Sequence, residues 1–587
     1  MTLKKSLVCA VILFALASSL LSGCSLLEGT VYPSQSVASE EAADSMNGWS
    51  LEDSVLNGAP LVEDKRIYNG DDPSKITTFF VTVYPTVDDE GNTRTFADFN
   101  LHMARDHTYN PTLNCLIQEG DGNGLKVDGL GYQDNAANAT MRVRGNSARG
   151  ADLKSYKIVL FNSTGEWENQ SSLNLNKHYG DPSKVAQKFS MDLMVRLNDI
   201  ASMRTRFVRL YIKDLSAQDP TGQYVDYGLY TQTEQPNKTY LRNRGLDENG
   251  TIYKAEMFNF AKNPDYLKNV DDPDYNAAAF ETILDIREGG KDHAKLLQML
   301  GDINDYNKDF DGVFNKYFNK ENYLTWMAVN FLLGNEDTTM HNFMLYSPEN
   351  SLTWYFLPWD YDGTFRHGEE RSDYYAPDSL YGVPHYWPIV LHRRFLQNPD
   401  NVDLLIQKID EIHVVFTDDG GRELLEDYKT VLRQFMTKEP DISHSEMPPN
   451  EIEPYIDGFM NFIDDNYRKV IASIQYPMPS YISEPKRLSN GDVQFDWEAS
   501  YDLQNDLITY DFTIAKDPDM VDVVFSKSDY IGTRIAVQGL LPGTYYCKLI
   551  IKDDKGHQQY SADNYQLLEN GTKLLASYWG EKEVVIE

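Results

Sequence analysis

The stretch that decides the fold is residues 337–342, DTTMHN, followed further along by residues 360–363, DYDG. The residues between them form two runs of β-strand composition around a turn-like sequence at 347–350. We therefore expect a hairpin whose open ends lie side by side. This arrangement brings Asn342 next to Asp360, and converging amide and carboxylate oxygens are the ligands that a hard divalent cation prefers. The sequence predicts a metal site at this end of the hairpin.

A helix is predicted directly before the first acidic segment, because apolar side chains recur at helical spacing through residues 319–333. Helix, polar loop, hairpin and carboxylate is the order of the catalytic segment in protein kinases. There the spacing Asp-x-x-x-x-Asn places a base and a magnesium ligand on one loop. In this interpretation Asp337 is the base, while Asn342, Asp360 and Asp362 surround the metal. The alternative is that the last two residues only terminate a turn.

A candidate phosphate-binding loop occupies residues 144–150, RGNSARG, between two strand-like runs. Backbone amides and cationic side chains in such a loop can approach phosphate oxygens. Arg144 and Asn146 are its candidate ligand-binding residues. The loop lacks the Gly-x-Gly-x-x-Gly pattern of ordinary kinases, so an ordinary surface turn is the alternative.

The strand after this loop carries Lys157, whose side chain should face away from those of Tyr156 and Ile158. This orientation makes Lys157 the candidate lysine for phosphate contact. Lys154 and Lys254 compete for the role, and a solvated strand lysine is the alternative interpretation.

An amphipathic helix is predicted over residues 183–198, at the place of the regulatory helix of kinases. Residues 207–212 and 227–232 follow as a strand pair. Glu234 ends this pair where a kinase has the hinge that contacts adenine. It is a candidate nucleotide-binding carboxylate, and the alternative is an exposed residue at the end of a strand.

Several ordered motifs resemble those of the CotH family of spore-coat-type atypical protein kinases, over about residues 120–470. The resemblance implies a bilobed, protein-kinase-like fold that uses ATP with Mg²⁺ or Mn²⁺ to phosphorylate Ser or Thr of proteins. Known members include spore-coat kinases and surface proteins. The motifs are MRVRGNS at 141–147, KSYKI at 154–158, YGLYTQTE at 227–234, HNFMLY at 341–346 and PWDYD at 358–362.

Charge and length limit the function further. The 587 residues provide room for several domains. With 89 acidic and 54 basic residues, the net charge of -35 argues against nucleic acid as a partner. The same field repels ATP, so an ATP site in this chain requires a local cluster of basic residues.

The N-terminus predicts an extracytoplasmic, membrane-anchored protein at the bacterial surface. Residues 1–23 read as a signal peptide with an apolar core at 7–21, and small residues before Cys24 look like a lipobox. Lipidation of Cys24 would then attach the protein to the membrane. Residues 24–72 lack periodicity and read as a flexible tether. A cleaved signal with an incidental Cys and a single membrane anchor are the alternatives.

The remaining boundaries complete an α+β chain. Residues 73–135 are β-rich and form either a small module or an extension of the first lobe, and 136–475 is the kinase-like domain. Alternating strands at 480–568 look like a fibronectin type III β-sandwich. Cys115 and Cys547 should be free buried thiols.

We therefore expect a surface-anchored protein kinase acting on an unidentified protein substrate. Two other classes stay open. One is a binding or scaffold protein that keeps the fold without transfer. The other is an enzyme of the same fold that transfers AMP instead of the γ-phosphate.

Overall fold

The computed structural model describes residues 59–101, 109–122, 124–290, 292–365, 377–570 and 573–587. These form two compact units. The barrel unit contains the described residues within 51–367 and 404–466, and the sheet unit those within 368–403 and 467–587. The predicted signal peptide and Cys24 lie outside the described residues. Among the helices that are described, none is long and apolar enough to cross a membrane.

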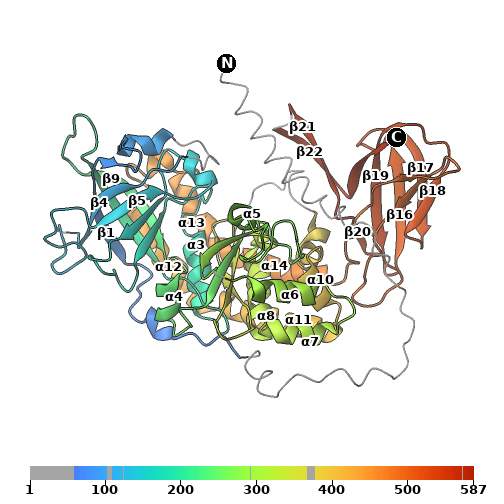
Figure 1. Ribbon diagram of the computed structural model, residues 1–587, viewed down its shortest axis with the longest axis horizontal. Coiled ribbons are helices and arrows are strands. Elements are labelled where there is room, and N and C mark those ends of the chain that lie inside the picture. The colour runs from blue at the N-terminus through green and yellow to red at the C-terminus, as the bar shows by residue number, and fades with distance from the viewer. Residues whose placement is uncertain (1–58, 102–108, 123, 291, 366–376, 571–572) are drawn as a thin grey trace. The chain divides into compact units, whose positions relative to one another are not determined.

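The barrel unit begins with a closed seven-stranded barrel, coloured blue to teal in Figure 1. A parallel pair, β1 with β8, closes it, and all other neighbours are antiparallel. In barrel order the strands are β1 (Ile76–Val83), β4 (Leu113–Gly120), β5 (Ala139–Val143), β6 (Tyr156–Leu160), β7 (Ser172–Asn176), β9 (Val225–Thr233) and β8 (Thr205–Asp214).

Alternate side chains of these strands point inward, as the period of two requires. They form one buried cluster that includes Phe79, Cys115, Met141, Ile158 and Val208. Because β1 and β4 are strands of this barrel, the predicted β-rich segment 73–135 contributes to the barrel instead of forming a separate module. A two-stranded ribbon of β2 (Thr86–Val87) and β3 (Thr93–Arg94) lies between them in the chain.

The predicted tether ends earlier than residue 72. Leu61 is buried, and the Glu63 carboxylate forms an ion pair 2.9 Å from Arg244. A short 3-10 helix, η2 (Lys65–Tyr68), follows. Residues from about 61 therefore belong to the folded unit, because their apolar and charged side chains are buried there.

A second sheet follows the barrel in the same unit, in the order β11-β10-β12-β13. Its strands are β10 (Thr251–Ala255), β11 (Leu284–Glu288), β12 (Phe343–Ser347) and β13 (Tyr355–Pro358). The helices are α3 (Ala186–Val195), α4 (Lys238–Asn243), α5 (Ala277–Glu281), α6 (Ala294–Ile303), α7 (Phe310–Tyr317), α8 (Lys320–Leu333), α11 (Pro399–Thr417), α12 (Asp419–Phe435), α13 (Pro449–Asp457) and α14 (Phe459–Ser473). The last residues of α14 and the first residues of α11 belong to the sheet unit.

The sheet unit contains the short helices α9 (Val383–Tyr386) and α10 (Val390–Leu396) and two larger sheets. A three-stranded sheet has the order β14-β15-β18, formed by Lys486–Arg487, Val493–Asp496 and Arg534–Val537. A five-stranded sheet joins β17 (Val523–Tyr530), β16 (Thr509–Ala515), β19 (Gly543–Lys552), β20 (Gln558–Tyr560) and β23 (Glu581–Ile586). A separate hairpin pairs β21 (Asn564–Glu569) with β22 (Lys573–Trp579).

Side chains from both larger sheets share one core, in which the ring centres of Phe495 and Phe512 lie 5.4 Å apart. The predicted C-terminal boundary at residue 568 is too early, because β23 pairs with β19 along residues 543–548. Cys115 and Cys547 are free and buried, as expected, and burial raises the pKa of both thiols.

Candidate active site

The hairpin predicted around the acidic segments is present. Strands β12 and β13 pair in antiparallel register with Phe343 opposite Pro358, so Asn342 and Asp360 extend from the same open end. Helix α8 precedes the hairpin, beginning at an Asn319 cap and ending at Gly334 in the left-handed conformation. This local order follows from the sequence because capping and turn residues fix each boundary.

Two of the predicted metal ligands have a left-handed backbone. The φ angle is 58° at Asn342 and 61° at Asp360. This conformation is uncommon outside glycine, although Asn and Asp tolerate it best, and the surrounding structure must hold it. Gln187 of α3 accepts a 2.6 Å hydrogen bond from the Tyr361 amide, and the buried Tyr361 hydroxyl donates to Asn330 at 2.7 Å. The residue after Asp360 is thus held by its backbone and by its side chain.

Asp337 lies on a 3-10 turn, η5 (Glu336–Thr338), with an exposed carboxylate. One of its oxygens is hydrogen-bonded to His341, and the other accepts a 2.6 Å bond from Nδ2 of Asn342. Burial lowers the pKa of His341, but the hydrogen bond and charge of Asp337 outweigh it, so the pKa is raised. Because Asn342 donates through Nδ2, its side-chain oxygen Oδ1 takes no part in this contact. Oδ1 is the atom that a metal ion would bind.

The Asp360 carboxylate lies where like charges gather. Burial raises its pKa, and the negative charges of Asp337 and Glu256 raise it further. Arg144 and Lys254 act in the opposite direction. Carboxylate and side-chain amide oxygens are the ligands that Mg²⁺ or Mn²⁺ prefers in proteins. The donor chemistry of Asp360 and Asn342 therefore suits a divalent cation.

A cluster of basic side chains adjoins these acids. Lys157 of β6 points away from the core, between the buried Tyr156 and Ile158, as predicted. Burial, together with the positive charges of Arg142, Arg287 and Arg144, lowers the pKa of Lys157 to about 8. Cations are gathered here in a protein of net charge -35, which is the arrangement an anionic ligand requires.

Arg144 connects the basic and acidic groups. Its charge acts on Lys157, and the charges of Asp360 and Asp362 act on Arg144. The guanidinium carbon lies 6.0 Å from the centre of the Trp359 ring, next to Asp360 in the chain. Burial nevertheless lowers the pKa of Arg144, because the charged form loses water.

The competing lysines and Asn146 have distinct places. Lys154 is buried and donates to the backbone oxygens of Arg149 and Ala151, each at 2.7 Å, so it closes the turn after the loop. Lys254 pairs with Glu256 at 2.6 Å on the acidic side of the site. Asn146 is exposed on the loop between β5 and β6. Of the three candidate lysines, Lys157 is the one within the basic cluster.

Glu234 is placed in a buried ion-pair network that needs no nucleotide. Its two carboxylate oxygens lie 3.0 Å from Arg204 and 2.6 Å from Arg244, and all three side chains are at most 3% exposed. Burial raises the pKa of Glu234, but the two arginines outweigh it, so the pKa is lowered. The alternative interpretation, an exposed residue at the end of a strand, is also wrong, because Glu234 is buried.

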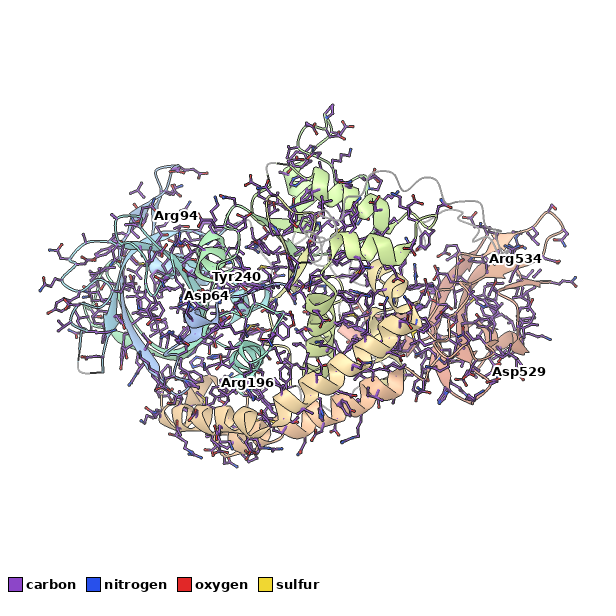
Figure 2. All side chains as sticks on the ribbon, turned by 90° about the horizontal axis from the view of Figure 1, so that it is seen from below. Asp64, Arg94, Arg196, Tyr240, Asp529 and Arg534 are labelled. Atoms are coloured by element: carbon purple, nitrogen blue, oxygen red, sulfur yellow. The ribbon has the colours of Figure 1, made fainter. Side chains whose placement is uncertain are left out.

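Two further contacts extend the network. The Arg244 guanidinium stacks 3.8 Å from the ring centre of Tyr240, and the Arg244 carbonyl accepts a 2.9 Å bond from the Asp64 amide. Tyr240 and Asp64 are both labelled in Figure 2. The network therefore joins the segment before the barrel to α4.

Sequence reasoning missed Arg142, Arg287, Glu256 and Gln187 as members of the site. Arg142 could have been predicted from the sequence, because it lies two positions before Arg144 and so points to the same face of the strand. In the β5–β6 register it lies directly opposite Lys157. The other three come from β11, from the residue after β10 and from α3, and they reach the site only through tertiary contacts.

Comparison with known proteins identifies a family for this chain. The family model for CotH kinase protein matches residues 141–470, more than half of the chain. The chain belongs to the CotH family. The matched region contains every candidate active-site residue described above, whereas β1 and β4, which complete the barrel, precede it.

A curated relative of this CotH chain is the inner spore coat protein H of Bacillus subtilis (strain 168). The two are 26% identical over 240 residues, which is 40% of this chain and 61% of the relative. The match thus spans about three fifths of the length of that protein.

Proposed function

We propose that this CotH protein is a kinase that transfers the γ-phosphate of ATP to Ser or Thr side chains of proteins. The observation that carries the proposal is the meeting of two charge clusters at Arg144. On one side are Lys157 and its neighbouring arginines, and on the other are Asp337 and Asp360. A polyphosphate bound with a divalent cation has the complementary charges.

In this proposal the basic residues bind the phosphates. Arg144 and Lys157 contact the ATP phosphates, with Arg142 and Arg287 adding positive field. Asn342, Asp360 and Asp362 would hold Mg²⁺ or Mn²⁺, which would neutralise charge on the transferred phosphoryl group.

Asp337 orients the acceptor hydroxyl and takes its proton. The hydroxyl oxygen forms a bond to the γ-phosphorus, the bond from that phosphorus to the β–γ bridging oxygen breaks, and ADP leaves. The His341 and Asn342 contacts would hold the Asp337 carboxylate in a fixed orientation for this step.

The proposed location is the extracytoplasmic face of the bacterial membrane, through a lipid on Cys24. Its support is the lipobox-like sequence at residues 21–24 together with a relative named as a spore coat protein. The C-terminal pair of sheets, with strand orders β14-β15-β18 and β17-β16-β19, supports a fibronectin type III-like sandwich as an appended module.

ATP labelled separately at the α and γ phosphates tests the reaction. The purified protein is incubated with casein and each label, in Mg²⁺ and in Mn²⁺. A kinase transfers the γ label alone, and transfer of the α label would instead identify an AMP transferase. Absence of both, in the substrate and in the protein itself, would favour the scaffold alternative. Asp360→Asn is the control that should abolish any transfer at this site.

A further inference from the structure

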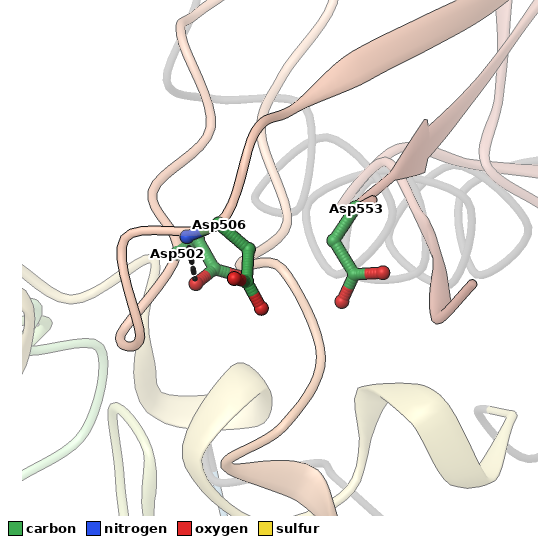
Figure 3. A group of neighbouring side chains, drawn as sticks. All are labelled: Asp502, Asp506 and Asp553. Atoms are coloured by element: carbon green, nitrogen blue, oxygen red, sulfur yellow. Dashed lines mark hydrogen bonds between the residues drawn. The ribbon is translucent and has the colours of Figure 1, made fainter. Parts of the chain in front are cut away.

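Three carboxylates of the sheet unit converge outside the candidate active site. Asp502 and Asp506 lie in the loop between β15 and β16, and Asp553 directly follows β19. One oxygen from each lies within 4.8 Å of the others. In Figure 3 the carboxylates of Asp502 and Asp506 lie together, and that of Asp553 lies across from them. Segments about fifty residues apart in the chain thus contribute to one cluster.

Asp502 is the member whose burial needs an explanation. Asp502 is only 4% exposed. Oδ1 accepts hydrogen bonds of 2.9 Å from the amides of Gln504 and Asp506. Oδ2 is buried and has no hydrogen-bond partner among the described residues. A buried carboxylate oxygen without a partner is costly, and such an atom signals a missing ligand such as an ion.

The basic side chains already near the cluster contact its other two members. Lys555 lies 3.1 Å from Asp506 but also 2.8 Å from Asp554, and its side chain is 58% exposed. His557 lies 2.6 Å from Asp553. Burial raises the pKa of Asp553, but hydrogen bonds from the His557 side chain and from two backbone amides outweigh it, so the pKa is lowered. Among the ion pairs of the described residues, none includes Asp502.

We propose that Asp502, Asp506 and Asp553 bind a Ca²⁺ ion. Calcium takes six to eight oxygen ligands at about 2.4 Å, so oxygens on opposite sides of the ion lie about 4.8 Å apart. Magnesium sits at about 2.1 Å in strict octahedral geometry and usually takes only one or two protein carboxylates. Three carboxylates on two loops suit the larger, less demanding ion. Water and backbone carbonyls supply its remaining ligands, and Lys555 swings into solvent.

The bound ion would hold neighbouring segments of the sheet unit together. The same loop contacts the segment after the last helix, where Gln504 donates to the Ile474 carbonyl at 3.2 Å and the Met478 amide donates to the Tyr501 carbonyl at 2.8 Å. Calcium would join this loop to the turn after β19, and the loop's own hydrogen bonds extend the connection to residues 474–478. The role is structural and independent of the proposed kinase reaction.

Calorimetric titration with CaCl₂ tests the site in the full-length protein carrying Asp360→Asn, which silences the candidate catalytic metal site. We expect one Ca²⁺ per chain, with a dissociation constant of about 0.1–1 mM, as in extracellular calcium modules. Adding Asp502→Asn should weaken binding at least tenfold. Adding Asp529→Asn, which removes an exposed carboxylate elsewhere in the sheet unit, should leave binding unchanged.

The Asn side chain at 502 still accepts both amide hydrogen bonds, so folding should survive, and thermal unfolding in EDTA checks this. If that variant unfolds, Asp506→Asn at a half-buried position decides the question. The proposal is overturned if the Asp360→Asn protein binds no Ca²⁺, if the Asp502 or Asp506 variant binds as well as its parent, or if Mg²⁺ binds equally tightly.

Discussion

Replacing Glu234 by Gln separates a structural role from a nucleotide-binding one. The change keeps the shape of the side chain but removes its charge and turns one acceptor into a donor. Arg204 and Arg244, whose side chains are 3% and 0% exposed, would then lose the carboxylate that lies 3.0 Å and 2.6 Å from them. Glu63 still faces Arg244, so one of the two arginines keeps a partner.

The expected loss follows from burial. Removing one partner of a buried ion pair leaves an uncompensated charge and costs about 3–5 kcal/mol. The matched control is Glu166→Gln, which breaks an ion pair of 2.7 Å with Arg242 whose members are 34% and 50% exposed. Exposed pairs contribute only about 0–1 kcal/mol, because water screens them.

Urea unfolding followed by circular dichroism measures both variants against the wild type. Mg-ATP affinity, measured by calorimetry in the folded protein, should stay within a few fold for both. The reasoning is refuted if Glu234→Gln is as stable as Glu166→Gln. A stable Glu234→Gln protein with much weaker ATP binding would return Glu234 to the nucleotide site.

Three further predictions concern the anchor, the basic cluster and the metal. Cys24→Ala should leave the protein unlipidated, so detergent-phase partitioning should fall, and equal partitioning of both proteins would contradict the lipobox. Lys157, with its pKa lowered to about 8, is charged below that pH and neutral above it, so Mg-ATP affinity should decline above pH 8 by at most about tenfold per unit. Lys157→Arg should remove this dependence, and titrations at pH 7 and 9 check it. Asp360→Asn should abolish the stabilisation by Mg-ATP, about 2.7 kcal/mol at a hundredfold excess over Kd, and thermal unfolding that still responds to Mg-ATP would place the metal elsewhere.

Local features were predictable from the sequence because short-range rules determine them. Helix α8 carries its own caps at Asn319 and Gly334, and the following hairpin carries its own turn, so the juxtaposition of Asn342 and Asp360 follows directly. Strand alternation predicts that the Lys157 side chain faces away from the core, and the burial pattern of β6 confirms this orientation.

Long-range features were not predictable in this way. Arg287 and Glu256 join the site only because β10 and β11 belong to the same sheet as β12, and no local pattern encodes that pairing. Glu234 has the sequence neighbourhood of a kinase hinge, yet its partners Arg204 and Arg244 come from other segments. The end of the tether was misplaced for the same reason, because Glu63 is buried by a contact with residue 244.

The central claim is that Asp337 serves phosphoryl transfer at this site, and single-turnover transfer from γ-labelled ATP tests it most directly. Asp337→Asn should slow transfer by about a hundredfold or more while Mg-ATP affinity stays within a few fold, because a general base acts in the transition state. Glu336→Gln, which alters the neighbouring exposed carboxylate, should transfer at the wild-type rate. Transfer by Asp337→Asn at the wild-type rate would contradict the account.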